Sequence, residues 1–404
     1  MPLLKDIGYL ATCRDEGGQG EIHPVRDAAV AWQEGRIAWV GPEKELPDEY
    51  RTHRIYSAGG AMVIPGLVDC HTHLAFGGWR PREFALRMQG KSYLEINKEG
   101  GGILSTMNAT RAATEEELHE KALAFLRRMQ RMGVTTVECK SGYGLSTEHE
   151  LKTLRVYRRL AEEGRQHIVS TFLGAHTLPP EFEDDRGGYL DLVCQEMIPA
   201  VAEEGLARFC DVFLEEGAFT REEARRVLTA GLAAGLAPKL HADQLSSCGG
   251  AELAGELEAA SADHLEQISE EGIAAMAQSG VVGVTLPIAS LYTRQPSLDC
   301  RRLLEAGVPV AVATDFNPGS APSYDLHLAM MLSCTQGWLS PAQALKGATL
   351  QAARALRMER EVGSVEAGKW ADLAVVDAPD PEFWMYHWSP GAVTQVFQRG
   401  EAVR

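Results

Sequence analysis

Polar side chains with metal-binding and acid–base capacity gather at the ends of apolar runs in this sequence. Six of them form the group that we take as the candidate site: His71, His73, His176, His241, His264 and Asp315. His71 and His73 are two residues apart, so on a strand both imidazoles point to one face, roughly 7 Å from each other. Three imidazoles and a carboxylate can hold a metal ion and leave a position for water. Because a bound metal lowers the pKa of water towards about 7, the pattern predicts metal-assisted hydrolysis.

Some of these residues also fit a structural role. A histidine pair separated by one residue is a weak signal when it stands alone, and His176 and His264 could be hydrogen-bonded core histidines. Lys140 and Glu215 also stand at the ends of apolar runs and could pair with each other as scaffolding inside the fold. Such a buried pair would need no catalytic role.

The elements that must position these side chains alternate regularly along the chain. Eight apolar runs are candidate strands: 62–69, 133–140, 167–174, 209–215, 238–243, 261–265, 281–286 and 309–315. Amphipathic helical patterns lie between them, among others at 115–131, 148–163, 221–234 and 269–279. Apolar strands that are each followed by a helix are typical of a parallel sheet covered by helices. Eight of them predict an α/β fold with a closed (β/α)₈ barrel, whose chemistry lies at the C-terminal ends of the strands.

The two ends of the chain differ from this pattern. Short strand patterns occur at 28–32, 36–40, 53–57, 372–376 and 393–399. We expect them to form a small β-sandwich domain from residues 1–60 and 365–404, with the barrel in residues 61–364.

Composition excludes several classes of partner. The 404-residue chain has a formal net charge of −17, which repels nucleic acid and anionic lipid. Its eight cysteines are scattered without a C-x-x-C pair and predict reduced core residues. We see no signal peptide, and no apolar run reaches the roughly 18 residues of a membrane span. These features predict a cytoplasmic protein that binds neither nucleic acid nor membranes.

Two motifs resemble the amidohydrolase superfamily. The first is the run into the histidine pair, Val63-Ile-Pro-Gly-Leu-Val-Asp-Cys-His-Thr-His73. The second is Gly363-Ser-Val-Glu-Ala-Gly-Lys-Trp-Ala-Asp-Leu373, which resembles the return of the chain into the small β-domain of that superfamily.

Further motifs, in order along essentially the whole chain, resemble the imidazolonepropionase family. They are Phe76-Gly-Gly-Trp-Arg80, Gly100-Gly-Gly-Ile103, Lys140-Ser-Gly-Tyr-Gly144, Phe172-Leu-Gly-Ala-His176, His241-Ala-Asp-Gln244, Ser261-Ala-Asp-His264 and Ala313-Thr-Asp-Phe-Asn-Pro-Gly319. The resemblance implies a hydrolase that opens the cyclic amide of 4-imidazolone-5-propanoate to N-formimidoyl-L-glutamate in histidine degradation. It also implies a homodimer that acts on this small molecule.

The resemblance assigns a role to each candidate. One zinc or iron ion would be bound by His71, His73, His241 and Asp315. Asp315 and His264 would take the proton from the attacking water, and His176 would stabilise the oxyanion. Contacts to substrate and product would come from Arg80, Tyr143, His176, Gln244, Asn317, Gly319 and Ser320, with Arg80 on the propionate. Ser320 stands where the family leads us to expect Thr. Gln244 stands where some members have Glu, and an amide there cannot act as a base.

Other readings remain open at this level. Glu215 occupies the place where some superfamily members bridge a second metal ion. An aminohydrolase acting on a purine or pyrimidine would share the metal ligands but would give no reason for Arg80. A paralogue without activity, or an oligomer whose metal only stabilises the fold, is a further alternative. Residues 77–106 could form a loop that closes over the substrate.

Overall fold

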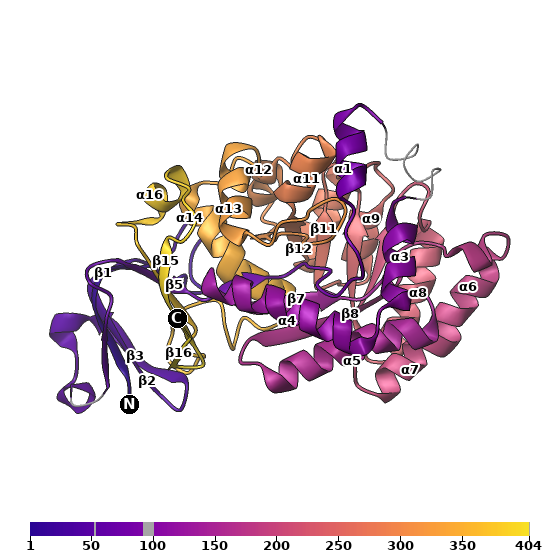
Figure 1. The fold of residues 1–404 in the computed structure, drawn as a ribbon. Helices are drawn as coiled ribbons and strands as arrows, with labels where there is room; N and C mark the ends of the chain where they lie inside the picture. Colours follow the sequence, from indigo (N-terminus) through magenta and orange to yellow (C-terminus); the bar gives the residue numbers. More distant parts are fainter. Residues whose placement is uncertain (52–53, 92–100, 404) are drawn as a thin grey trace.

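The computed structural model describes residues 1–51, 54–91 and 101–403, and these form two sheets of eight strands each (Figure 1). One sheet is an all-parallel barrel, and the other is a mixed sheet built from both ends of the chain. The predicted fold class is therefore confirmed.

The barrel strands follow one another in chain order. They are β6 (Leu67–Asp69), β7 (Val134–Lys140), β8 (His167–Ala175), β9 (Phe209–Leu214), β10 (Ala237–Ala242), β11 (Ser261–His264), β12 (Val282–Thr285) and β13 (Val310–Val312). Beyond their ends the last strand returns to the first. The N–H of Asp315 donates to the carbonyl of His71 at 3.0 Å, and that of His73 to the carbonyl of Phe316 at 2.8 Å. This closure brings the segments carrying His71, His73 and Asp315 side by side.

The prediction of one continuous strand over 62–69 is wrong. β5 (Met62–Pro65) pairs with β14 (Leu373–Val376) in the terminal sheet, whereas β6 opens the barrel. The chain changes sheets at Gly66, where a Cβ would lie 2.2 Å from Oγ1 of Thr135. A single apolar run thus serves two sheets because glycine allows this close passage.

The terminal sheet runs in the order β16-β15-β14-β5-β1-β2-β3, and β4 pairs with β1. Its remaining strands are β1 (Leu3–Leu10), β2 (Val25–Gln33), β3 (Arg36–Pro42), β4 (Ile55–Ser57), β15 (Val393–Gln398) and β16 (Glu401–Ala402). The sequence patterns did not predict β1 or β16. The predicted strand at 53–57 begins at residue 53, which lies outside the described part of the chain. The domain boundaries at residues 60 and 365 stay a prediction.

The helices lie mostly on the outside of the barrel (Figure 1). In chain order they are α1 (Pro81–Met88), α3 (Ile103–Ala112), α4 (Glu115–Arg131), α5 (Thr147–Glu163), α6 (Arg186–Leu192), α7 (Ile198–Glu203), α8 (Arg221–Ala233), α9 (Gly250–Glu256), α10 (Glu270–Ser279), α11 (Pro287–Thr293), α12 (Cys300–Glu305), α13 (Leu326–Thr335), α14 (Pro341–Lys346), α15 (Ala352–Ala355) and α16 (Pro381–Tyr386). Shorter 3₁₀ or π segments are Glu43–Glu45, Asp48–Tyr50, Pro180–Phe182, Val193–Met197 and Gly347–Gln351.

Local sequence sets where these helices begin. α4 starts after a capping box, in which Thr114 Oγ1 accepts from the N–H of Glu117 and the Glu117 carboxylate accepts from the N–H of Thr114 at 2.8 Å. The four helices predicted from amphipathic patterns are confirmed to within one residue at each end. Among the described residues, no helix is long and apolar enough to cross a membrane.

The predicted closing loop at 77–106 contains all of α1 and the first turn of α3. Residues 92–100, which include the first glycine of the triple-glycine motif, lie outside the described residues. Closure of this loop over a substrate stays a prediction.

Candidate active site

The four predicted metal ligands converge at the C-terminal end of the barrel. His71 and His73 directly follow β6, His241 lies on β10 and Asp315 follows β13. Oδ1 of Asp315 lies 3.4 Å from Nε2 of His71 and 3.5 Å from Nε2 of His73. Nε2 of His241 lies 3.4 Å from Nε2 of His73. All four side chains are buried, so the donors surround one small volume shielded from solvent.

This donor set fits a metal ion. Possible ligand atoms of His71, His73 and His241 all lie within 4.8 Å of one another, and among the described residues the buried Nε2 of His71 has no hydrogen-bond partner. Burial lowers the pKa of His73 and holds that of His241 well below its usual value, so both are neutral imidazoles, the form that binds metals. Burial acts to raise the pKa of Asp315, but His71 and His73 outweigh it and hold the pKa well below its usual range.

Carboxylates behind the histidines orient the rings. Oδ2 of Asp263 lies 2.6 Å from Nδ1 of His71, and Oδ1 of Asp211 lies 3.1 Å from Nδ1 of His241. An ionised carboxylate only accepts hydrogen bonds, so each Nδ1 carries a proton and each Nε2 is left free for a metal. Burial acts to raise the pKa of Asp263, but Lys239, Lys140 and His71 outweigh it and lower the pKa. Sequence reasoning gave neither aspartate a role, although both interrupt apolar strands.

Buried lysines balance the charge of these carboxylates. Nζ of Lys140 lies 2.7 Å from Oδ2 of Asp211, 3.0 Å from Oε1 of Glu138 and 3.5 Å from Oδ2 of Asp263. Lys239 also reaches Glu138, at 2.9 Å. All these side chains are fully buried. A second possible cluster of metal ligands, made of His71, Glu138 and Asp263, is therefore filled by ammonium groups.

The alternative in which Lys140 pairs with Glu215 is wrong. The Glu215 carboxylate instead holds the loop after β10, accepting from the N–H groups of Gln244 at 3.1 Å and Leu245 at 2.8 Å and from the hydroxyl of Ser246. Neither ligand cluster found among the described residues includes Glu215. Glu215 therefore stabilises the loop after β10, next to the candidate site.

The predicted substrate contacts line one cavity of about 850 Å³ above the metal ligands. Lining residues from the predicted set are His73, Arg80, Tyr143, His176, His241, Gln244, His264, Asp315, Asn317, Gly319 and Ser320. The structure thus brings every predicted substrate contact to one space. Arg87 also lines it, and sequence reasoning missed this residue because α1 carries no motif that singles it out.

One end of the cavity is built to receive negative charge. The Arg80 side chain is nearly buried; its Nη1 lies 3.7 Å from Oε2 of Glu83, while among the described residues its Nε has no hydrogen-bond partner. Its guanidinium lies against the turn at Gly319, where Arg87 donates to the carbonyl at 2.6 Å. Oδ1 of the Asn317 side chain accepts from the N–H groups of Gly319 and Ser320, both at 2.8 Å, which fixes this turn. A guanidinium fork next to an ordered turn suits a carboxylate.

His176 presents an acceptor to the cavity. Its Nδ1 lies 2.9 Å from the carbonyl of Gly142, and a carbonyl only accepts, so Nδ1 carries the proton. Burial lowers the pKa of His176 to about 3, which keeps the ring neutral and leaves Nε2 without a proton. The expected role of His176 as a donor to an oxyanion therefore does not fit this geometry. The loop that holds it is fixed by the buried Glu150, which accepts from three backbone N–H groups of residues 142–145.

His264 enters the cavity from a strained backbone. It has φ 80° and is followed by Leu265 with φ 71°, both in the left-handed region that residues other than glycine rarely adopt. Asp315 also has a positive φ, 54°. Burial lowers the pKa of His264 to about 4, so its ring is neutral and can accept a proton. Such outliers gather at functional sites, where the surrounding structure holds them in place.

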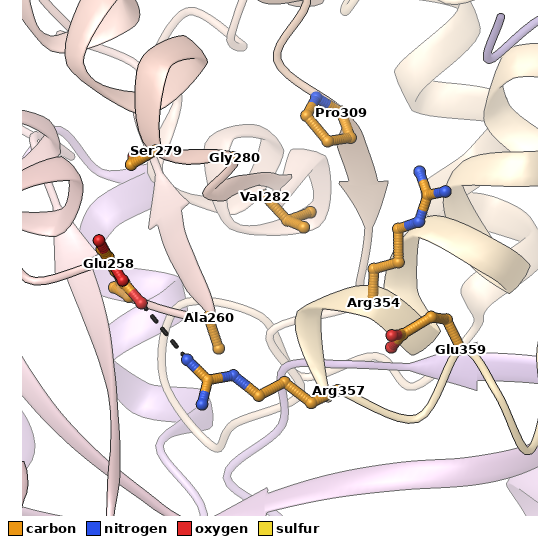
Figure 2. Close-up of a pocket in the computed structure, with 10 residues that line it drawn as sticks. Glu258, Ala260, Ser279, Gly280, Val282, Pro309, Arg354, Arg357 and Glu359 are labelled. Atoms are coloured by element: carbon orange, nitrogen blue, oxygen red, sulfur yellow. Dashed lines mark hydrogen bonds between the residues drawn. The ribbon is translucent and has the colours of Figure 1, made fainter.

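A second hollow of about 420 Å³ lies at the opposite end of the barrel (Figure 2). It is lined by residues at the starts of β11, β12 and β13 and by Arg354, Arg357 and Glu359. Arg357 donates to the carbonyl of Glu258 across it at 3.3 Å. None of the candidate site residues lines this hollow.

Comparison with known proteins agrees with this geometry. A model of the amidohydrolase family matches residues 62–403. The chain is 47% identical to imidazolonepropionase of Geobacillus kaustophilus (strain HTA426) over 94% of this chain and 90% of that one. It is 46% identical to imidazolonepropionase of Symbiobacterium thermophilum over 99% of this chain and 96% of that one. Among solved structures it resembles an adenosine deaminase from Xanthomonas campestris with bound zinc, with a TM-score of 0.72 and 20% identity over 99% and 92% of the two chains. At that identity the likeness concerns the fold.

Proposed function

The chain belongs to the amidohydrolase family and, within it, to the imidazolonepropionases, and on that premise we propose how its site works. It is a hydrolase that opens the cyclic amide of 4-imidazolone-5-propanoate to N-formimidoyl-L-glutamate, a step of histidine degradation. The observation that carries the assignment in the structure is that one cavity holds both the convergent metal donors and the Arg80 guanidinium. A cyclic amide with a carboxylate tail needs both.

The metal donors would be His71, His73, His241 and Asp315. When bound there, a metal ion supplies hydroxide at neutral pH by acidifying water and polarises a carbonyl. Asp263 and Asp211 hold the His71 and His241 rings so that each Nε2 faces the donor set. The buried lysines keep those carboxylates ionised.

At the other end of the cavity, Arg80 binds the propionate carboxylate and so fixes how far the ring enters. The turn of Asn317, Gly319 and Ser320 lies beside it and contacts the glutamate portion of the product. His176 accepts a hydrogen bond at Nε2 from an N–H of the imidazolone ring, because its only proton is committed to the carbonyl of Gly142. Tyr143, whose ring centroid lies 5.4 Å from that of His176, forms the adjoining wall.

Proton transfer falls to Asp315 and His264. As the oxygen of water attacks the ring carbonyl carbon, its proton passes to one of these two groups. The bond between that carbon and the ring nitrogen then breaks, and the same proton goes to the leaving nitrogen. Gln244 lines the cavity but is a neutral amide and cannot take the proton. General acid–base assistance of this kind contributes about 10²- to 10⁴-fold in rate.

Several finer points rest on the family resemblance. We propose one zinc or iron ion per chain, with Glu215 outside its shell, a homodimer and a cytoplasmic location. The net charge of −17 supports the absence of nucleic acid and membrane partners. Two metal ions per chain in a metal analysis would refute the single-ion proposal, and a monomer in sedimentation would refute the homodimer. Neither result would refute the proposed reaction.

The direct test is turnover of freshly prepared imidazolonepropionate, followed by loss of its ultraviolet absorbance before and after chelation. We expect turnover that chelation abolishes and that added zinc or iron restores. Guanine and cytosine serve as controls for an aminohydrolase and should not react. Absence of turnover by folded, metal-loaded protein would refute the assignment.

A further inference from the structure

Near the groups proposed to transfer protons, two buried polar atoms face each other and make no hydrogen bond with each other. Nδ1 of His264 and Oε2 of Glu266 lie 3.8 Å apart, and the two side chains are 2% and 3% exposed. Within the described part of the chain neither atom has a hydrogen-bond partner. A separation of 3.8 Å is too long for a hydrogen bond, but a shift of less than about 1 Å would form one. Buried polar atoms without partners are rare and call for an explanation.

The strained backbone is what brings Glu266 to this position. Residues 264 and 265 both have positive φ, and this bend turns the chain so that the side chain two residues on lies beside the His264 ring. Backbone bonds hold the bend, from the N–H of Leu265 to the carbonyl of Ala242 at 3.0 Å and from that of Gln267 to the carbonyl of Asp243 at 2.8 Å. A regular strand would place the side chains of residues 264 and 266 on one face but pointing in parallel.

The other oxygen of Glu266 is anchored. The hydroxyl of Ser290, on α11, donates to Oε1 at 2.9 Å, and Ser290 is itself buried. Among the described residues, His264 is the one basic side chain within 4.0 Å of the Glu266 carboxyl. A buried carboxyl is normally paired, and the available partner is the histidine that lines the substrate cavity.

We infer that Glu266 is a positioning residue for His264, accepting a hydrogen bond from Nδ1–H so that Nε2 is left without a proton and faces the reacting groups. The inference depends on the proposed function in one respect, namely that Nε2 of His264 receives the proton of the attacking water. The arrangement is that of a carboxylate behind a general base, where the acid sets the tautomer and stabilises the imidazolium that forms.

The charges of the pair are suited to this task. Both side chains are almost fully buried, so an imidazolium or a carboxylate would be unfavourable here without a partner of opposite charge. When Nε2 takes the proton from water, imidazolium and carboxylate at hydrogen-bond distance compensate each other. The proton can therefore be held in a dry site until the leaving nitrogen takes it.

The matched variants are Glu266→Gln and Glu252→Gln. Glu252 is also held by a serine, with the hydroxyl of Ser269 donating at 2.7 Å, and its other oxygen is also buried without a partner in the described residues. Unlike Glu266, it has no histidine nitrogen within 4.0 Å of its carboxyl among the described residues. We expect Glu266→Gln to lower kcat about 100-fold with KM and metal content kept, and Glu252→Gln to leave kcat within about twofold. In a His264→Ala background, Glu266→Gln should cost no further activity, because it acts through His264.

The second readout needs no substrate. ¹⁵N chemical shifts of His264 in the zinc-loaded protein should show a protonated Nδ1 and a bare Nε2, and Glu266→Gln should mix or reverse this assignment. If that variant does not fold, Ser290→Ala, which frees the carboxylate from its anchor, should mix the tautomers and lower kcat by a smaller factor. Wild-type kcat in Glu266→Gln, or a loss that adds to that of His264→Ala, would overturn the inference. Absence of wild-type turnover would instead refute the proposed function, and the ¹⁵N result would still decide the role of Glu266.

Discussion

Gly319 lies so close to Arg80 that a single added methyl group should separate the substrate carboxylate from its guanidinium. A Cβ at position 319 would lie 1.4 Å from Nη2 and 2.1 Å from Cζ of Arg80. The backbone of Gly319 does not have a positive φ, so Gly319→Ala is not strained for conformational reasons. The methyl group must therefore displace the Arg80 side chain.

The size of the effect follows from the lost interaction. A hydrogen bond to a charged group contributes about 1.5–3 kcal/mol. At 1.36 kcal/mol for each factor of ten, that corresponds to a loss of about 10- to 150-fold in kcat/KM. Because Arg80 binds a part of the substrate that does not react, most of this loss should be in KM if the ring still reaches the metal donors.

The assay is steady-state turnover of imidazolonepropionate by the wild type, Gly319→Ala and Arg80→Ala. Gly187→Ala is the matched control, because a Cβ at Gly187, on α6, would meet nothing within 4 Å. We expect Gly319→Ala to fall near Arg80→Ala and the double variant to be no worse than either. A Gly319→Ala enzyme with the wild-type kcat/KM would refute the placement of Arg80 on the carboxylate.

Three further outcomes follow from the structure. Lys140→Met leaves three buried carboxylates without the cation that they share, so urea denaturation should show that the free energy of unfolding falls by about 3–5 kcal/mol. A decrease below about 1 kcal/mol would contradict a stabilising role of this ion-pair network. Burial lowers the pKa of His327, stacked on Trp384, to about 4. Between about pH 4 and 6.5 the unfolded chain binds a proton that the folded chain does not, so the contribution of His327 to stability is present above about pH 6.5 and lost as the pH falls towards 4. Plotted against pH in that window, the unfolding free energy of His327→Gln should rise less steeply than that of the wild type. An unchanged slope would contradict the lowered pKa of His327. Chelation should lower the melting temperature by about 5 °C or more, since the ion binds only the folded donors, and a melting curve unmoved by chelation would argue that no ion is held there.

The residue types and spacing in the sequence determined much of the fold and the chemistry. The spacing of two predicts that His71 and His73 share a face; both lie just beyond β6, where the bridge of Thr72 to Phe316 keeps the chain extended. Eight apolar runs alternating with amphipathic helices leave a parallel barrel as the simplest way to bury them, and a barrel gathers strand ends on one rim. These are local properties, and the predicted barrel and family are confirmed.

Only the tertiary structure decides which side chains face one another across the barrel. The Lys140 side chain meets Glu138, Asp211 and Asp263 rather than Glu215, because the stagger between neighbouring strands sets which inward-pointing side chains share a layer. The proton on His176 is placed by a carbonyl of a loop folded back on it, which no spacing in the sequence reveals.

Backbone conformation also escaped the sequence. The apolar run 62–69 contains Pro65-Gly66, a pair typical of turns, but only the packing of Thr135 against Gly66 shows that the run is divided between two sheets. The positive φ of His264 and Leu265 brings Glu266 back to the His264 ring. Residue type does not reveal this bend, because leucine rarely has a positive φ and histidine has one in only a small fraction of cases. Sequence thus determined which chemical groups stand at the rim of the barrel. The positions and protonation of those groups depend on contacts between residues far apart in the chain, which exist only once the barrel has closed.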